Sequence, residues 1–344
     1  MAADLRHPPG LLRSYAARMV PQRAFLLLAA IAGLVLLCLW RVPRAGSALI
    51  RRAFTRGGAR TVARLAPFVP AHVAGRRGVA YGTRPEELLD VWYPEGTEHP
   101  LPTVVWVHGG GWVAGSPADV EPYAKILAAE GYTVVAVDYT LAPAARYPLP
   151  LRQVNAAIGW LVEHAEELHI DADRLVLAGD SAGAQISAQL AAAITEPSYA
   201  DLIGLRPAIG AGQLCGVISH CGPQAPALLA GARGIGGWFV RTVGRAYFAT
   251  TSFDSPRVRE ASVAEHVSSR YVPTLVTGGN GDPLTIQGRL FTERLTDAGV
   301  DVTALFWPAD HEPPLGHEFQ FDLNLPESQQ VLDATKDFLA RVTR

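Results

Sequence analysis

Cysteine and lysine are scarce in this sequence. Its 344 residues include three cysteines, too few for a dense disulfide framework, and these cysteines lack the spacing of a metal-binding motif. Cys215 and Cys221 could form a bridge across a turn, but buried free thiols are the expected state. The 30 basic residues, nearly all arginine, balance 32 acidic residues at a net charge of −2. Because no basic face is visible along the body of the chain, nucleic-acid binding is not predicted.

Two nucleotide-binding signatures are missing as well. The chain has no glycine-rich loop that ends in Gly-Lys-Ser/Thr, and its glycine cluster does not match G-x-G-x-x-G. Neither a metal nor an organic cofactor is therefore predicted. With 49% hydrophobic and 18% charged residues, the chain can bury a sizeable core, as one large α/β domain with appendages or as two smaller domains.

One uncharged segment stands apart from the rest of the chain. Residues 24–40 carry no charge and are flanked by Arg23 and Arg41. As a helix they would rise about 25 Å, the short end of what spans a bilayer. The expected localisation is therefore the membrane, through a single N-terminal anchor. A cleaved signal peptide that releases a secreted protein, with small residues at 45–48, and a helix in the membrane plane are the alternatives.

From about residue 76 onward, strand and helix patterns alternate. Continuous apolar runs end in glycine clusters at 102–111 and at 174–180, whereas 149–168 and 329–342 have helical spacing. Such alternation predicts an α/β fold with a mostly parallel central sheet and helices on both faces, here the α/β-hydrolase fold. The expected division is a basic segment (1–23), the anchor (24–40), a linker and cap contribution (41–75) and the catalytic domain (76–344), with 222–266 inserted as a cap.

The strongest chemical signal is a G-x-S-x-G pentapeptide over residues 179–183. It lies between an apolar strand and a helix, where small neighbours permit a sharp turn that exposes the hydroxyl of Ser181 above the sheet. Backbone N–H groups at the start of the helix lie beside that hydroxyl. Ser181 is therefore the candidate nucleophile, and an ordinary helix-capping serine is the alternative.

A second signal is "HGGGW" at 108–112, directly after another apolar strand. Acyl transfer builds negative charge on a carbonyl oxygen, and fixed N–H donors stabilise it. Because glycines let the backbone approach closely, the N–H groups of Gly110 and Gly111, together with that of Ala182, are predicted to form an oxyanion hole. A flexible turn is the alternative. His108 is expected to shape the loop rather than to catalyse.

These motifs resemble the α/β-hydrolase esterases of the hormone-sensitive-lipase and bacterial feruloyl/acetyl-xylan-esterase type. The resemblance covers roughly residues 76–343 and also rests on "DYTLAP" (138–143), "GNGDPL" (279–284) and "GHEF" (316–319). It implies a Ser, Asp, His triad in that order along the chain, with the HGGG loop and the residue after the nucleophile as the oxyanion hole.

The acid and the base can also be argued from the residues themselves. Asp282 follows an apolar strand and a glycine-rich loop, at the end of the strand where such sites lie, although it could instead cap the next helix. His317 leads into Phe319 and Phe321, whose alternation can anchor it, whereas His311 lies in a charged, proline-bounded stretch. Because a general base must be held within reach of its partner, His317 is preferred over His311.

The sequence thus predicts a serine carboxylesterase or lipase-like hydrolase that acts on a small-molecule or lipid ester. The alternatives are a membrane-associated lipid or isoprenylcysteine methyl esterase, an amidase or acyltransferase with the same triad, and a non-catalytic binding protein of the same fold. Trp112, Tyr139 and His220 are the predicted substrate-binding residues. The oligomeric state is left open.

Overall fold

The computed structural model describes residues 43–344, together with residues 25, 27, 30 and 33. Within these residues, no helix combines the length and the apolar character needed to cross a bilayer. The expected basic segment (1–23) and most of the expected anchor (24–40) lie outside the described residues, so that both stay predictions.

A single eight-stranded sheet organises the described chain, with the strand order β1-β2-β4-β3-β5-β6-β7-β8. Strands β1, β2 and β4 pair antiparallel, and every pairing from β4 through β3 to β8 is parallel. The predicted mostly parallel sheet is therefore confirmed. The strands are β1 (Val73–Ala80), β2 (Leu88–Pro94), β3 (Leu101–Val107), β4 (Thr133–Val137), β5 (Ile170–Asp180), β6 (Leu214–His220), β7 (Thr274–Gly278) and β8 (Val302–Phe306).

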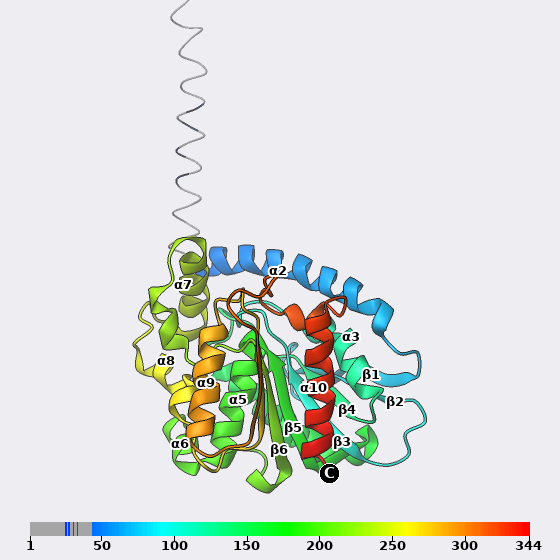
Figure 1. Cartoon of the computed structure of the whole chain (residues 1–344). Coiled ribbons are helices and arrows are strands. Elements are labelled where there is room, and N and C mark those ends of the chain that lie inside the picture. The colour runs from blue at the N-terminus through cyan, green and yellow to red at the C-terminus, as the bar shows by residue number, and fades with distance from the viewer. Residues whose placement is uncertain (1–24, 26, 28–29, 31–32, 34–42) are drawn as a thin grey trace, which may run out of the picture.

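The helices cover both faces of this sheet and one of its ends (Figure 1). The α-helices are α2 (Pro43–Leu65), α3 (Pro117–Ala128), α4 (Leu149–Glu163), α5 (Ser181–Thr195), α6 (Pro197–Leu202), α7 (Gly234–Phe248), α8 (Pro256–Glu260), α9 (Thr285–Asp297) and α10 (Pro326–Val342). The 3-10 helices are η1 (Ala66–Phe68), η2 (Glu166–Leu168), η3 (Ala211–Gln213), η4 (Pro226–Gly231), η5 (Val263–Glu265) and η6 (Phe319–Phe321).

The core forms two apolar layers because the central strands bury both of their faces. Apolar side chains of α3 and α10 pack with one face, and those of α4, α5 and α9 pack with the other. Strand β4 is buried along its whole length, as its continuous Val and Ala sequence predicts for a strand covered on both sides. This packing holds the carboxyl ends of the parallel strands in a fixed arrangement, where ligand sites of such sheets form.

Helix α2 crosses the end of the sheet and meets α7, which belongs to the segment predicted as a cap (222–266) (Figure 1). The rings of Phe54 in α2 and Phe239 in α7 stack with their centroids 5.9 Å apart. The sheet itself begins at Val73, slightly before residue 76, where the catalytic domain was predicted to start. That difference arises because the "VAGRRGVA" sequence of β1 is exposed and charged, and so lacks an apolar strand signal.

Candidate active site

Ser181 occupies the abrupt junction between β5 and α5. Its φ of +50° lies in the left-handed region, which is uncommon for a residue other than glycine and marks a sharp turn. The turn brings α5 so close to β3 that a Cβ at Gly183 would overlap the carbonyl oxygen of Val107. A glycine two residues after the serine is therefore a packing requirement, and the turn directs the hydroxyl of Ser181 into a cavity.

His317 reaches this hydroxyl from the loop after β8. Its Nε2 lies 2.9 Å from Oγ of Ser181, so the serine O–H can donate to the ring. Its Nδ1 lies 2.8 Å from Oδ2 of Asp282, to which the ring N–H donates. The structure thus brings together the three residues that the sequence singled out, with the imidazole between the hydroxyl and the carboxylate.

Asp282 also holds the start of the following helix. Its Oδ1 accepts the backbone N–H of Leu284 at 2.9 Å, while Oδ2 faces His317. Helix capping and contact with the histidine were treated as alternatives from the sequence, but each role uses a different carboxylate oxygen, so Asp282 has both. The side chain of Asp282 is fully buried, so its orientation is fixed by both hydrogen bonds.

His311 lies elsewhere on the same loop. Its Nε2 is 3.0 Å from Oε1 of Glu327 in α10, and its backbone oxygen accepts Nδ2 of Asn280 at 2.8 Å. These contacts tie the loop to neighbouring segments. The contacts of His311 therefore anchor the loop and do not involve Ser181 or Asp282.

The glycine loop after β3 presents unused backbone donors. Gly110 and Gly111 have φ values of +104° and +61°, and a Cβ at Gly110 would overlap the carbonyl of Ala114. The N–H of Gly109 donates to Oδ2 of Asp180 at 2.8 Å, whereas no described residue accepts the N–H groups of Gly110, Gly111 or Ala182. Those three groups are the ones predicted for the oxyanion hole.

The three predicted substrate-binding residues differ in their positions. Trp112 lines the apolar cavity next to Ser181. Tyr139 is buried beneath the glycine loop, where its hydroxyl donates to the carbonyl of His108, and His220 is buried with Nδ1 2.8 Å from Oγ1 of Thr277. Neither Tyr139, two residues after β4, nor His220, the last residue of β6, lines that cavity, because both side chains are buried beneath it.

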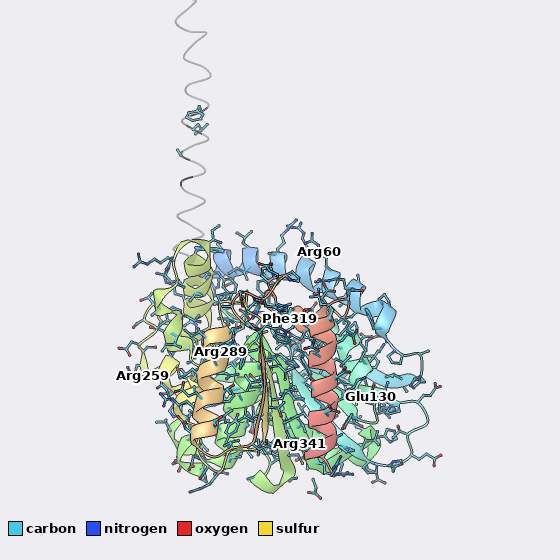
Figure 2. All side chains as sticks on the ribbon, in the orientation of Figure 1. Arg60, Glu130, Arg259, Arg289, Phe319 and Arg341 are labelled. Atoms are coloured by element: carbon cyan, nitrogen blue, oxygen red, sulfur yellow. The ribbon has the colours of Figure 1, made fainter. Side chains whose placement is uncertain are left out.

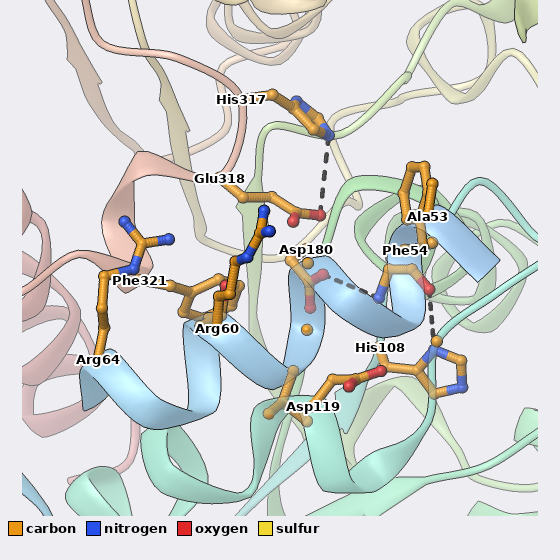
Figure 3. A pocket seen from close by; sticks show the side chains of 17 residues that line it. Ala53, Phe54, Arg60, Arg64, His108, Asp119, Asp180, His317, Glu318 and Phe321 are labelled. Atoms are coloured by element: carbon orange, nitrogen blue, oxygen red, sulfur yellow. Dashed lines mark hydrogen bonds and ion pairs between the residues drawn. The ribbon is translucent and has the colours of Figure 1, made fainter. Parts of the chain in front are cut away.

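Two cavities flank the Ser181–His317 pair. The first, of about 530 Å³, has Ser181 and His317 in its wall and is otherwise lined mainly by apolar side chains of α2 and α7. The second, of about 450 Å³, is more polar than the first because charged side chains join its apolar wall, and it lies between α2 and the glycine loop; Figure 3 shows this polar cavity with Arg60, Asp119, Asp180 and Glu318 around it. His317 lines both cavities, whereas Ser181 lines only the first.

Two acidic side chains, Asp180 and Glu318, lie next to Ser181 and His317, and they were not identified from the sequence. Oδ1 and Oδ2 of Asp180 accept Nε1 of Trp106 and N–H of Gly109, both at 2.8 Å. Burial, and next the neighbouring Glu318 carboxylate, raise the pKa of Asp180. The only available signal was adjacency, since Asp180 precedes Ser181 and Glu318 follows His317.

Glu318 also acts on the histidine. Its Oε1 is 3.7 Å from Nε2 of His317, as the dashed line in Figure 3 marks. Burial disfavours the imidazolium, but the hydrogen bond to Asp282 and the charges of Glu318 and Asp282 outweigh it and raise the pKa of His317 above 6.5. The surroundings therefore favour the protonated, positively charged form of the ring.

Three potential metal ligands meet at this position. Ligand atoms of Cys221, Asp282 and His317 lie within 4.8 Å of one another. Burial raises the pKa of Cys221 far above its usual value, so its sulfur is a neutral thiol and a poor ligand, and Asp282 and His317 already bond to each other. The donor set does not suit a metal. The thiols of Cys215 and Cys221 are free, as expected, but only Cys221 is also buried, since Cys215 is partly exposed.

Comparisons with known proteins bear on the fold and on the site. A family model described as alpha/beta hydrolase fold matches residues 104–313, more than half of the chain. Esterase LipC of Mycobacterium tuberculosis is 31% identical over 226 residues, which cover 64% of this chain and 55% of LipC. Hormone-sensitive lipase of Ictidomys tridecemlineatus is 40% identical over 94 residues, which cover 27% of this chain and 12% of the lipase.

Solved structures agree on the fold. Esterase B from Lactobacillus Rhamnosis superimposes with a TM-score of 0.73 at 24% identity, covering 87% of this chain and 96% of that one. At 24% identity, this structural similarity supports the fold and not the activity. The matched region spans only about half of the length of LipC and a smaller share of the lipase, so that activity has to be argued from the site.

Proposed function

Because this chain belongs to the alpha/beta hydrolase fold family, as its resemblance to hormone-sensitive lipase indicated, we propose that it is a serine carboxylesterase. The observation that carries the proposal is the line of hydrogen bonds from Ser181 through His317 to Asp282. The unoccupied N–H groups of Gly110, Gly111 and Ala182 support it further. A nucleophile, a base with its orienting acid, and donors for an oxyanion are the parts that acyl transfer requires.

The proposed reaction has two steps, the acylation of Ser181 and the hydrolysis of the acyl-serine. The hydroxyl proton of Ser181 passes to Nε2 of His317 as Oγ attacks the ester carbonyl, and the oxyanion is held by backbone N–H donors. The C–O bond then breaks, and the alcohol leaves with the proton from His317, so that an acyl-serine remains. Water then gives one proton to the same nitrogen as its oxygen attacks the acyl-serine. The bond from the acyl carbon to Oγ breaks, Oγ takes that proton from His317, and the carboxylic acid leaves.

The apolar cavity sets the proposed substrate class. Its walls include Trp112, Phe239 and Val243, so the acyl or alcohol group that enters it should be hydrocarbon. We expect turnover of p-nitrophenyl esters of short to medium chain length. A fluorophosphonate should label the protein at one serine, and the modified peptide identified by mass spectrometry should contain Ser181. Labelling at any other serine, or hydrolysis that survives full labelling of Ser181, would contradict the proposal.

The Glu318 carboxylate near His317 leads to a prediction about how activity depends on pH. A base must be neutral to accept a proton, and the pKa of His317 is raised, so kcat/KM should fall as pH drops through a midpoint above 6.5. Glu318 contributes to that raised pKa. Glu318→Gln should therefore move the acid limb of kcat/KM to lower pH and leave the variant with a larger share of its maximal rate at acidic pH.

Other charged groups around Glu318 are unchanged in this comparison. They are Asp180 and His108 at the strand ends, Asp282 behind the ring, and Arg60, Arg64 and Asp119 around the polar cavity. Glu312→Gln, on the same loop but exposed, removes the same charge and is the matched control. An acid limb that moves equally in both variants, or toward higher pH in Glu318→Gln, would count against this role of Glu318.

A further inference from the structure

Two arginine-rich segments, far apart in the sequence, form one end of the folded chain. Helix α2 contains six arginines and no acidic residue, and residues 222–253, which include η4 and α7, contain three arginines and no acidic residue. Figure 1 shows α2 and α7 side by side along the same end of the molecule, and the Phe54–Phe239 stack joins them. No basic face is visible along the sequence because the contact between α2 and α7 creates it.

Five of the six arginines of α2 divide into two groups. Arg51 bonds inward to the carbonyl oxygens of Val113 and Ala142, and Arg64 pairs with Asp322. Arg52, Arg56 and Arg60 follow at intervals of four, so they lie on one helical face.

These three arginines are exposed, and none has an ion pair with a described residue. Figure 2 places Arg60 at this end and Arg341 at the opposite end of the molecule. Arg52 and Arg56 therefore present unpaired positive charge to the solvent, and Arg60 is exposed at the same end while it also lines the polar cavity.

Exposed apolar side chains accompany this charge. Leu49 in α2, Leu228 in η4 and Ile235 in α7 are 47%, 51% and 87% exposed. A large aliphatic side chain with that exposure is unfavourable in water, and several of them at one end of a molecule mark an interaction surface. A partner that offers only negative charge, such as a nucleic acid, would leave them in water. A lipid bilayer with anionic headgroups accommodates both the charge and the apolar tips.

The apolar cavity opens on the same end. Leu49 and Ile235 line both the exposed surface and the cavity that contains Ser181. Helix α2 also begins three residues after the uncharged segment 24–40, so the part of the chain predicted to enter a membrane leads directly into this helix. Substrate dissolved in a bilayer that touches α2 and α7 would have a short path to Ser181.

We infer that the α2–α7 end of the protein, with Arg52, Arg56 and Arg60 around Leu49, Leu228 and Ile235, docks on an anionic lipid surface and takes its ester substrate from it. The docking step is independent of the proposed esterase function. Only the delivery of substrate rests on that function.

The docking test uses the full chain and sedimentation with vesicles of phosphatidylcholine alone or with 30% phosphatidylglycerol. The measured quantity is the ratio of the two partition coefficients, because binding through residues 24–40 would contribute to both. We expect a ratio of about tenfold or more at low salt, falling toward one at high salt, since each arginine near an anionic surface adds about 1 kcal/mol. Arg52→Glu/Arg56→Glu should bring the ratio close to one.

The matched control is Arg206→Glu/Arg294→Glu, which makes the same charge change at exposed positions after α6 and in the last turn of α9. It should keep the wild-type ratio. A wild-type ratio near one, an equal loss in the control, or binding to a duplex oligonucleotide in preference to the vesicles would overturn the proposal.

Delivery is measured separately. Arg52 and Arg56 line neither cavity, so the double variant should hydrolyse soluble p-nitrophenyl acetate at the wild-type rate. On a long-chain p-nitrophenyl ester carried in phosphatidylglycerol vesicles, it should be slower than wild type by about the factor lost in binding. Loss of vesicle binding without any esterase activity in either protein would support docking and reject the esterase proposal, so the two failures can be told apart.

Discussion

Replacing His317 by alanine should lower kcat for a p-nitrophenyl ester by about 10⁴-fold or more, whereas replacing His311 should lower it by less than about tenfold. His317 lies 2.9 Å from Oγ of Ser181, and without it the serine proton has no acceptor. His311 bonds to Glu327, so its loss should affect only the anchoring of the loop. The measurement is steady-state kinetics on both variants at several pH values.

The His311 variant is itself the matched control, since both substitutions remove a histidine from the same loop. Ser181→Ala should be as inactive as His317→Ala, and the double variant should be no worse than either, because residues that act as one unit do not add. If His311→Ala abolishes turnover while His317→Ala spares it, the base is misassigned. A double variant that is much slower than both single variants would also contradict a shared step.

Asp282→Asn should lower kcat by about 10⁴-fold while leaving the fold intact. The carboxylate accepts the Nδ1–H of His317 and so leaves Nε2 free to accept the serine proton. An amide can donate to Nδ1 instead, and the ring then carries its proton on the wrong nitrogen. Because Asp282 also raises the pKa of His317, any residual activity should have its acid limb at lower pH than in the wild type.

The second role of Asp282 needs its own control. The backbone N–H of Leu284 can still donate to the amide oxygen of an asparagine, so the melting temperature should change little. Asp310→Asn, at an exposed position on the loop that carries His317, removes the same charge and should keep wild-type kinetics. A large fall in melting temperature together with the activity loss would indicate that Asp282 acts mainly by holding the start of α9.

Much of the site could be predicted because the signals are local. The need for small residues around Ser181 follows from the sharp turn, and the overlap that a Cβ at Gly183 would make with Val107 gives the physical reason. Phe319 and Phe321 are buried, as the anchoring argument for His317 expected. Tyr139 and His220 were predicted to bind substrate, but neither lines the apolar cavity. The sequence shows that a residue lies near the end of a strand but not in which direction its side chain points.

The sequence by itself determined the alternation of strands and helices and the strand-to-helix turn at Ser181, because these depend on residues within a few positions of one another. Each of the motifs around Ser181, Asp282 and His317 is also local, and the family resemblance supplied their expected order along the chain. Only the tertiary structure decided that Asp180 meets Glu318, that Asp282 serves both His317 and Leu284, and that α2 lies against α7. Two of these contacts, Asp180 with Glu318 and α2 with α7, join residues more than a hundred positions apart, and the contact of Asp282 with His317 joins two different loops. They follow from the order in which the strands assemble, which no local pattern records.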